Sequence, residues 1–176
     1  KMRIAIISIL ILLSSLVFSQ NPVIFLEGKV TDYFSSNSIK NPTLILSENG
    51  RVVSKIEGKS NGKWYFNLRP ECFYILECKK EGMVSKKFII DTRNVEPKED
   101  YYIYLQITLF KKIEDFGFEF FESPIAWSKY DQTVRNMSWN NDFTEQKLIL
   151  YQLIMKEYIK SSGGYYRRKD SEFYFF

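Results

Sequence analysis

Short segments in which apolar and polar residues alternate fill most of residues 23–110 of this chain. In residues 101–110, Ile103 and Leu105 fall on one face and Tyr104 falls on the other. A repeat of two residues is the period of a β-strand that buries one face. Five further segments share the pattern: 23–32, 43–47, 63–68, 72–78 and 84–91. Residues 51–57 are expected to pair back on 43–47 across the Asn49-Gly50 turn. The chain is therefore predicted to be mainly β, with about seven strands.

Turn signals separate these segments at short intervals. Asn49-Gly50 supplies the positive φ angles that a two-residue hairpin needs. Gly62 and Gly82 mark two further turns. Strands joined by hairpins run antiparallel, and evenly spaced short strands of this kind close as two packed sheets. We therefore expect a seven-stranded antiparallel β-sandwich in residues 22–110, followed by a C-terminal α-helical extension.

The segment 111–160 has a different pattern and is expected to form this extension. Phe116, Phe118 and Phe120 alternate with smaller or charged residues, which predicts one more strand ending at Pro124. A loop is expected to follow it, carrying Trp127, Tyr130 and Trp139.

An amphipathic helix is predicted from Phe143 to about residue 160. Its apolar residues recur at three- or four-residue steps: Leu148, Tyr151, Met155 and Tyr158. Asp142 or Thr144 can cap its start, and the Ser-Ser-Gly-Gly run that begins at Ser161 ends it. The aromatic and basic tail, residues 161–176, can be an edge strand, a partner-binding tail or poorly ordered.

The first 19 residues have the layout of a secretory signal peptide. Lys1 and Arg3 form a positive start, and Ile4 to Leu13 form a mostly apolar run. A membrane anchor is disfavoured, because about 20 apolar residues are needed to cross a bilayer and this run ends at Ser14. We expect cleavage near Ser19, with no transmembrane segment in the mature chain and export to the periplasm or the outer membrane.

The charge balance and the absence of histidine exclude several function classes. The chain has 25 basic and 21 acidic residues; two of the basic ones lie in the leader, so the mature charge is 23 − 21 = +2. Nucleic-acid binders concentrate far more basic charge, so no nucleic-acid partner is expected. Without histidine there is no Ser-His-Asp or Cys-His pair and no His-containing zinc site. We expect no enzymatic activity, no catalytic residue, no metal and no cofactor.

The two cysteines are not expected to pair with each other. Cys72 and Cys78 lie on one predicted strand, which places them ~20 Å apart at ~3.3 Å per residue. A disulfide needs Cα atoms within ~7 Å. Buried free thiols on the same face as Tyr74 and Leu76 are the favoured state, and an intermolecular disulfide through Cys72 remains the alternative.

Four runs of sequence resemble the carboxypeptidase regulatory-like domain. They are GKVTD (28–32), NPTLIL (41–46), SNGKWYFNL (60–68) and YILECKKEGMVSKKFIIDT (74–92). The resemblance covers roughly residues 23–110 and implies a seven-stranded, transthyretin-like (prealbumin-like) sandwich without catalytic residues. Two positions depart from the family pattern: Asn61 stands where an acidic residue is usual, and Met83 where a tyrosine is usual.

The leader and residues 120–147 also resemble small exported envelope proteins of Bacteroidota. This resemblance is weaker and implies no reaction.

Two surface features are candidates for binding. The aromatic residues Tyr102, Tyr104, Trp127 and Tyr130 can form a binding surface, although burial under the C-terminal helix is the favoured interpretation. A lysine cluster, Lys79, Lys80, Lys86 and Lys87, is interpreted as a solvated strand end. Asp91, Asn94 and Glu96 supply oxygen ligands of the kind that calcium binds, close together in one loop region.

Taken together, the patterns favour a non-catalytic binding or scaffolding protein of the cell envelope. Its partner is expected to be an envelope protein, as for an accessory subunit of a periplasmic or outer-membrane assembly. The alternative is a carbohydrate-binding module that uses an exposed aromatic face.

Overall fold

The computed structural model describes residues 22–97 and 99–162. The expected signal peptide, residues 1–19, and nearly all of the expected tail, residues 161–176, lie outside the described residues.

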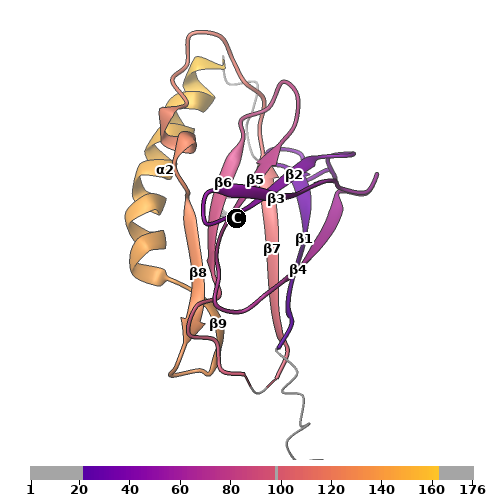
Figure 1. Ribbon diagram of the computed structural model, residues 1–176. Coiled ribbons are helices and arrows are strands. Elements are labelled where there is room, and N and C mark those ends of the chain that lie inside the picture. Colours follow the sequence, from indigo (N-terminus) through magenta and orange to yellow (C-terminus); the bar gives the residue numbers. More distant parts are fainter. Residues whose placement is uncertain (1–21, 98, 163–176) are drawn as a thin grey trace, which may run out of the picture.

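Two β-sheets form the body of the protein (Figure 1). The smaller has three strands in the order β4-β1-β7, and the larger has six in the order β3-β2-β5-β6-β8-β9. The strands are β1 (Ile24–Asp32), β2 (Thr43–Glu48), β3 (Arg51–Glu57), β4 (Lys63–Leu68), β5 (Phe73–Lys79), β6 (Lys86–Asp91), β7 (Tyr101–Leu109), β8 (Ala126–Asp131) and β9 (Asn136–Trp139). The β1–β7 and β6–β8 pairs are parallel, and the other pairs are antiparallel.

The expected mainly β sandwich with a C-terminal helix is confirmed, and the described residues contain nine strands instead of seven. The seven predicted strands correspond to β1–β7. Buried residues alternate with less buried ones along β1, β4, β5 and β7, whereas β3 has no buried residue. The β2–β3 hairpin turns at Asn49 and Gly50, whose φ angles are +49° and +83°. Positive φ at both positions matches the right-handed twist of the two strands, as the Asn-Gly pair predicts.

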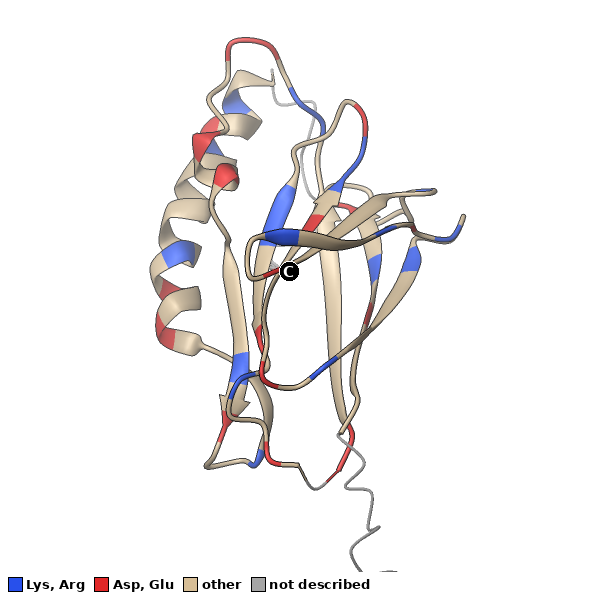
Figure 2. Cartoon of the chain, viewed as in Figure 1, with Lys and Arg blue, Asp and Glu red and all other residues tan. Residues whose placement is uncertain are grey.

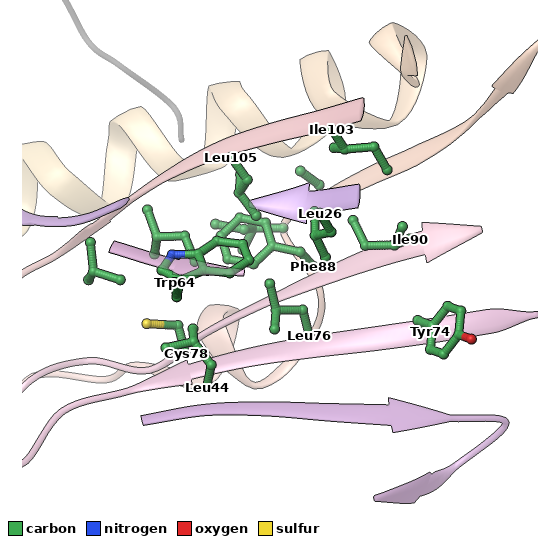
Figure 3. Packing of buried hydrophobic residues seen from close by; sticks show 14 of the residues in the cluster. Leu26, Leu44, Trp64, Tyr74, Leu76, Cys78, Phe88, Ile90, Ile103 and Leu105 are labelled. Atoms are coloured by element: carbon green, nitrogen blue, oxygen red, sulfur yellow. The ribbon is translucent and has the colours of Figure 1, made fainter. Parts of the chain in front are cut away.

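The core lies between the two sheets, where the inward side chains interdigitate (Figure 3). Trp64 of β4 is 3% exposed and lies against Gly28 of β1, its partner in the strand register. A Cβ atom at Gly28 would come within 2.7 Å of the indole and 1.8 Å of the Leu105 carbonyl oxygen. Glycine at this position therefore allows the large indole to lie flat within the sandwich.

The extension departs from its sequence-based description at two points. Residues 116–124 form no strand; they contain a short 3₁₀ helix, η1 (Glu119–Glu122), which buries Phe121. The phenylalanines gather around Tyr158 and Phe110 from several directions instead of lining one pleated face. The segment expected to be a loop forms the hairpin β8–β9, because the free edge of β6 accepts β8 as a parallel neighbour.

The predicted helix is α2 (Asn141–Ser161), and it packs against the sandwich. Its N-cap is Asn140, whose side chain accepts a hydrogen bond from the Phe143 backbone N–H at 3.3 Å, instead of the expected Asp142 or Thr144. Asparagine is as good a cap as aspartate, and it lies one residue before the first helical turn, where the acceptor is needed.

Three side chains of α2 are fully buried: Tyr151, Met155 and Tyr158. Their partners include Tyr33, Phe110 and Phe121, so the helix covers the part of the large sheet that the three-stranded sheet leaves open. In Figure 1 it runs beside β8, on the opposite flank from β4. Among the described residues, no helix combines the length and apolar character that spanning a bilayer requires.

Candidate ligand-binding surface

The outward face of the three-stranded sheet presents exposed tyrosines. Because Trp64 and Phe66 point inward on β4, Tyr65 between them points outward and is 63% exposed. The same alternation on β7 leaves Tyr102 and Tyr104 68% and 59% exposed. Large aromatic side chains at this exposure, three on one small sheet, are typical of a contact surface.

Phe25 of β1 belongs to the same surface. Its ring stacks on that of Tyr102, with centroids 4.9 Å apart and an angle of 17° between the planes. The two residues are partners in the parallel β1–β7 register, which explains the close approach. We call Phe25, Tyr65, Tyr102 and Tyr104 the outer tyrosine face.

A carboxylate lies at the centre of the outer tyrosine face. Glu27 on the middle strand β1 is in register with Tyr65 on one side and Tyr104 on the other. These residues line a hollow of about 170 Å³, together with Lys59 and Lys63. Glu27 is exposed, and within the described part of the chain no cation lies within salt-bridge distance of it. Its carboxylate is therefore free to accept hydrogen bonds from a ligand.

A larger cleft of about 610 Å³ opens beside this hollow, between β4 and the β2–β3 hairpin. We call it the edge cleft. It shares four lining residues with the hollow: Lys59, Lys63, Trp64 and Tyr65. Its volume falls in the range of small-molecule sites. The outer tyrosine face and the edge cleft are therefore adjoining parts of one surface.

Polar side chains line one end of the edge cleft. Arg69 donates hydrogen bonds at 2.8 Å to both carboxylate oxygens of Glu48, and this contact lowers the pKa of Glu48. Burial raises the pKa of Tyr74, which also lines the cleft, to about 12. The Nε1 atom of Trp64 is buried without a hydrogen-bond partner among the described residues.

The structure separates the four residues proposed as a binding surface. Tyr102 and Tyr104 lie exposed on the small sheet, so the expectation that the C-terminal helix buries them is wrong. Tyr130 is buried, and its ring centroid lies 5.7 Å from that of Tyr101. Trp127 is half-buried, and its ring centroid lies 6.0 Å from that of Phe143. The helix packs beside β8 instead, because β8 and β9 extend the large sheet and provide a surface on which the helix can pack.

Two members of the surface, Phe25 and Tyr65, were not identified from the sequence. The signal for Tyr65 was present, since it alternates with three inward residues of β4. What the alternation does not show is that β1 lies between β4 and β7, which brings Tyr65 and Tyr104 to the two sides of Glu27.

Lys86 contradicts the interpretation of the lysine cluster as a solvated strand end. It is fully buried, and its Nζ lies 3.2 Å from both Thr108 Oγ1 and Tyr151 Oη. It also lies 4.8 Å from the centre of the Tyr151 ring. Burial lowers the pKa of Lys86 to about 7. It lines neither the hollow nor the edge cleft, so we interpret it as a structural group.

Both cysteines are free and buried, as expected. Cys78 of β5 is the register partner of Lys86. Burial raises the pKa of the Cys78 thiol, so the thiol stays neutral and is not activated as a nucleophile.

Two of the three residues weighed as calcium ligands contact arginines. Asp91 pairs with Arg93 at 2.8 Å, and Glu96 pairs with Arg135 at 3.0 Å. Among the described residues, no group of three or more potential metal ligands is found.

No protein-family model matches the chain, and no curated protein matches it. Several solved structures share part of its fold at low similarity. The 3-chlorocatechol 1,2-dioxygenase of Rhodococcus opacus 1CP has 13% identity and a TM-score of 0.40, over 55% of this chain and 62% of that one. A Bacteroides fragilis protein described as membrane-associated and of unknown function has 10% identity and a TM-score of 0.38, over 55% and 30%. The 5-hydroxyisourate hydrolase of Klebsiella pneumoniae has 12% identity and a TM-score of 0.35, over 51% and 98%. The chain thus spans less than two thirds of the length of the first two.

Proposed function

We propose that this chain is a non-catalytic binding protein, exported to the cell envelope, that holds a glycan on the outer tyrosine face. In this proposal residues 22–110 are a carboxypeptidase regulatory-like, transthyretin-like domain, as the four sequence runs suggest. The observation that carries the proposal is the placement of Tyr65 and Tyr104 on the two sides of the exposed Glu27.

The chemistry of the surface suits a sugar chain. The C–H face of a pyranose ring packs on an aromatic ring, and carboxylates and amines at its edge exchange hydrogen bonds with the hydroxyls. Tyr65 and Tyr104 supply the rings, Glu27 accepts hydrogen bonds, and Lys59 and Lys63 donate them.

The spacing of the tyrosines suits several sugar units instead of one. Tyr102 and Tyr104 are two residues apart on β7, which corresponds to ~7 Å. Tyr65 and Tyr104 are separated by one intervening strand, which corresponds to ~10 Å. The edge cleft continues the same surface beyond Tyr65, so an oligosaccharide can cross the sheet and end in the cleft.

The test is binding of the purified protein to isolated cell-wall sacculi and to an array of soluble oligosaccharides. We expect Tyr104→Ala and Tyr65→Ala each to weaken binding about tenfold, because each removes one stacking platform. Val134→Ala is the matched control, since Val134 is 63% exposed and lies in the β8–β9 turn, outside the proposed surface. Retention of the wild type on neither probe, or equal binding by all variants, would reject the glycan proposal.

A second candidate is an accessory subunit that binds an envelope protein through strand β3. Among the described strands it lies at the edge of the six-stranded sheet, and it exposes Val52 and Val53 at 64% and 52%. An open edge with apolar side chains can accept a strand from a partner. Crosslinking in intact cells tests this candidate: a single stoichiometric partner, lost when Val53 is replaced by proline, would favour it over the glycan.

A further inference from the structure

The outward side of α2 carries a regular stripe of exposed residues. They recur at alternating steps of four and three: Asp142, Gln146, Ile149, Leu153, Lys156 and Lys160. We call these six residues the outer helix stripe. Its centre is apolar, with Ile149 65% and Leu153 56% exposed, and Leu150 borders it at 47%. The inward side of the helix is a separate row that the core covers completely.

The outer helix stripe is symmetric about the middle of the helix. Residue 151 is the midpoint of Asn141–Ser161. Ile149 and Leu153 lie two positions on either side of it, and Gln146 and Lys156 lie five positions away. Asp142 and Lys160 lie nine positions away and have opposite charges. If α2 of a second molecule crossed this helix antiparallel at the same midpoint, each residue would face its symmetric counterpart on the other helix. Ile149, for example, would face Leu153.

We propose that α2 packs antiparallel on α2 of a second copy of this chain, forming a two-fold homodimer. The four-and-three spacing is the heptad spacing at which two helices keep one seam in contact. In this arrangement Ile149 contacts Leu153 of the other copy twice, around the axis. Asp142 forms an ion pair with Lys160 of the other copy at each end of the seam, and Gln146 faces Lys156.

The charges along the helix favour this orientation over a parallel one. Figure 2 shows acidic positions at the start of α2, near β9, and basic positions together with an acidic one toward its end. A parallel pair would place Asp142 beside Asp142 and Lys160 beside Lys160, which is repulsive. Glu157 lies beside the stripe and pairs with Lys160 at 2.7 Å within the same helix. In the dimer Lys160 is therefore shared between Glu157 and Asp142 of the other copy.

The size of the contact predicts a weak dimer. A helix of this length is ~31 Å long, so one helix pair gives an interface at the small end of the specific range. We expect a dissociation constant on the order of micromolar. Figure 1 places α2 on the opposite flank from β4, so dimerisation leaves the outer tyrosine face free, and the inference does not depend on glycan binding.

The first test is sedimentation of the full chain from about 1 to 500 μM, a range that brackets a micromolar constant. We expect a concentration-dependent dimer for the wild type. Leu153→Lys should raise the dissociation constant at least about 100-fold, because it buries an unpaired charge at the centre of the seam. Val134→Lys adds the same charge at an exposed apolar position in the β8–β9 turn, outside the outer helix stripe, and should leave the dimer unchanged. A wild type that stays monomeric over this range would overturn the proposal. That result is also expected if the C-terminal tail of the same chain covers the stripe.

A charge-reversal pair tests the antiparallel register. Asp142→Lys alone gives two facing lysine pairs, and Lys160→Glu alone gives two facing acidic pairs, so each variant should dimerise at least about tenfold more weakly. An equimolar mixture should recover the dimer, because each acidic residue of one variant then faces a lysine of the other. Circular dichroism verifies that both variants keep the helix. Failure of the mixture to exceed the separate variants would reject this register.

Discussion

Trp64 is a large side chain of the core between the two sheets. Its indole is 3% exposed and contacts Gly28 across the strand pair. We expect Trp64→Ala to lower the free energy of unfolding by roughly 3–5 kcal/mol, since it leaves a large cavity between the sheets. Tyr65→Ala, one residue later on the exposed face, should change it by less than about 0.5 kcal/mol. Denaturant unfolding measures both, and a loss below about 1 kcal/mol for Trp64→Ala would contradict this assignment of the core.

Lys86 makes the stability of the protein depend on pH. Its pKa is about 7 in the folded chain and ~10.4 in the unfolded chain, so between these values the unfolded chain binds more protons. Stability therefore rises with pH in this window, by up to about 1.4 kcal/mol per pH unit. Ionisation of Cys78 in the unfolded chain opposes this rise above ~8.5, because burial raises the pKa of that thiol in the folded chain.

The comparison that isolates Lys86 is a series of unfolding experiments between pH 7 and 8.5. Lys86→Met removes the buried amine and keeps most of its volume, so the variant should be more stable than the wild type at pH 7, and its advantage should shrink as pH rises. Lys87→Met, at the half-buried neighbouring position, should keep the pH slope of the wild type. A wild-type slope equal to that of Lys86→Met would show that the amine is not buried.

Residue-level alternation could have identified Lys86 as inward, because it shares its face with Phe88 and Ile90. The charge of a lysine argued against burial. The side chains that form hydrogen bonds with the buried amine lie far away in the sequence, so the segment around Lys86 does not reveal them. Thr108 is 22 positions away, and Tyr151 is 65 positions away. A buried lysine is therefore predictable only when its distant partners are known.

At the scale of elements, the strands of the sandwich were predictable and the extension was only partly so. β1, β4, β5 and β7 alternate buried apolar residues with more polar ones, and turns at Gly50, Gly62 and Gly82 mark the ends of several strands, so most segments contain their own signal. β8 places Ala126 and Ser128 at two of its three inward positions, which gives no apolar alternation. It is a strand because β6 offers a free edge, and this property belongs to the sheet and not to the segment.

The position of the candidate site could not be predicted from the sequence either, because it depends on β8. The exposure of Tyr104 depends on where α2 packs, and α2 packs beside β8, which the sequence did not identify as a strand. Once β8 and β9 extend the large sheet, the helix has a bed on that flank, and the outer tyrosine face remains uncovered.

The whole molecule is expected to unfold as one unit, although its sequence suggests a sandwich with an appendage. Tyr151, Met155 and Tyr158 are as deeply buried as the centre of the sandwich, and the Tyr158 hydroxyl donates a hydrogen bond to the Lys111 carbonyl at 2.8 Å. The core of the protein is therefore continuous from Trp64 to the helix.

Tyr158→Ala tests this continuity. It should lower the free energy of unfolding by about 3–5 kcal/mol, and it should shift the tryptophan fluorescence transition and the far-ultraviolet helical transition together, because coincident transitions indicate a single cooperative unit. Leu153→Ala, on the exposed side of the same helix, should shift neither by more than about 0.5 kcal/mol when measured below the dimer concentration. If the helical signal were lost first while the fluorescence transition stayed in place, α2 would be a separable appendage, and the sandwich would be stable without it.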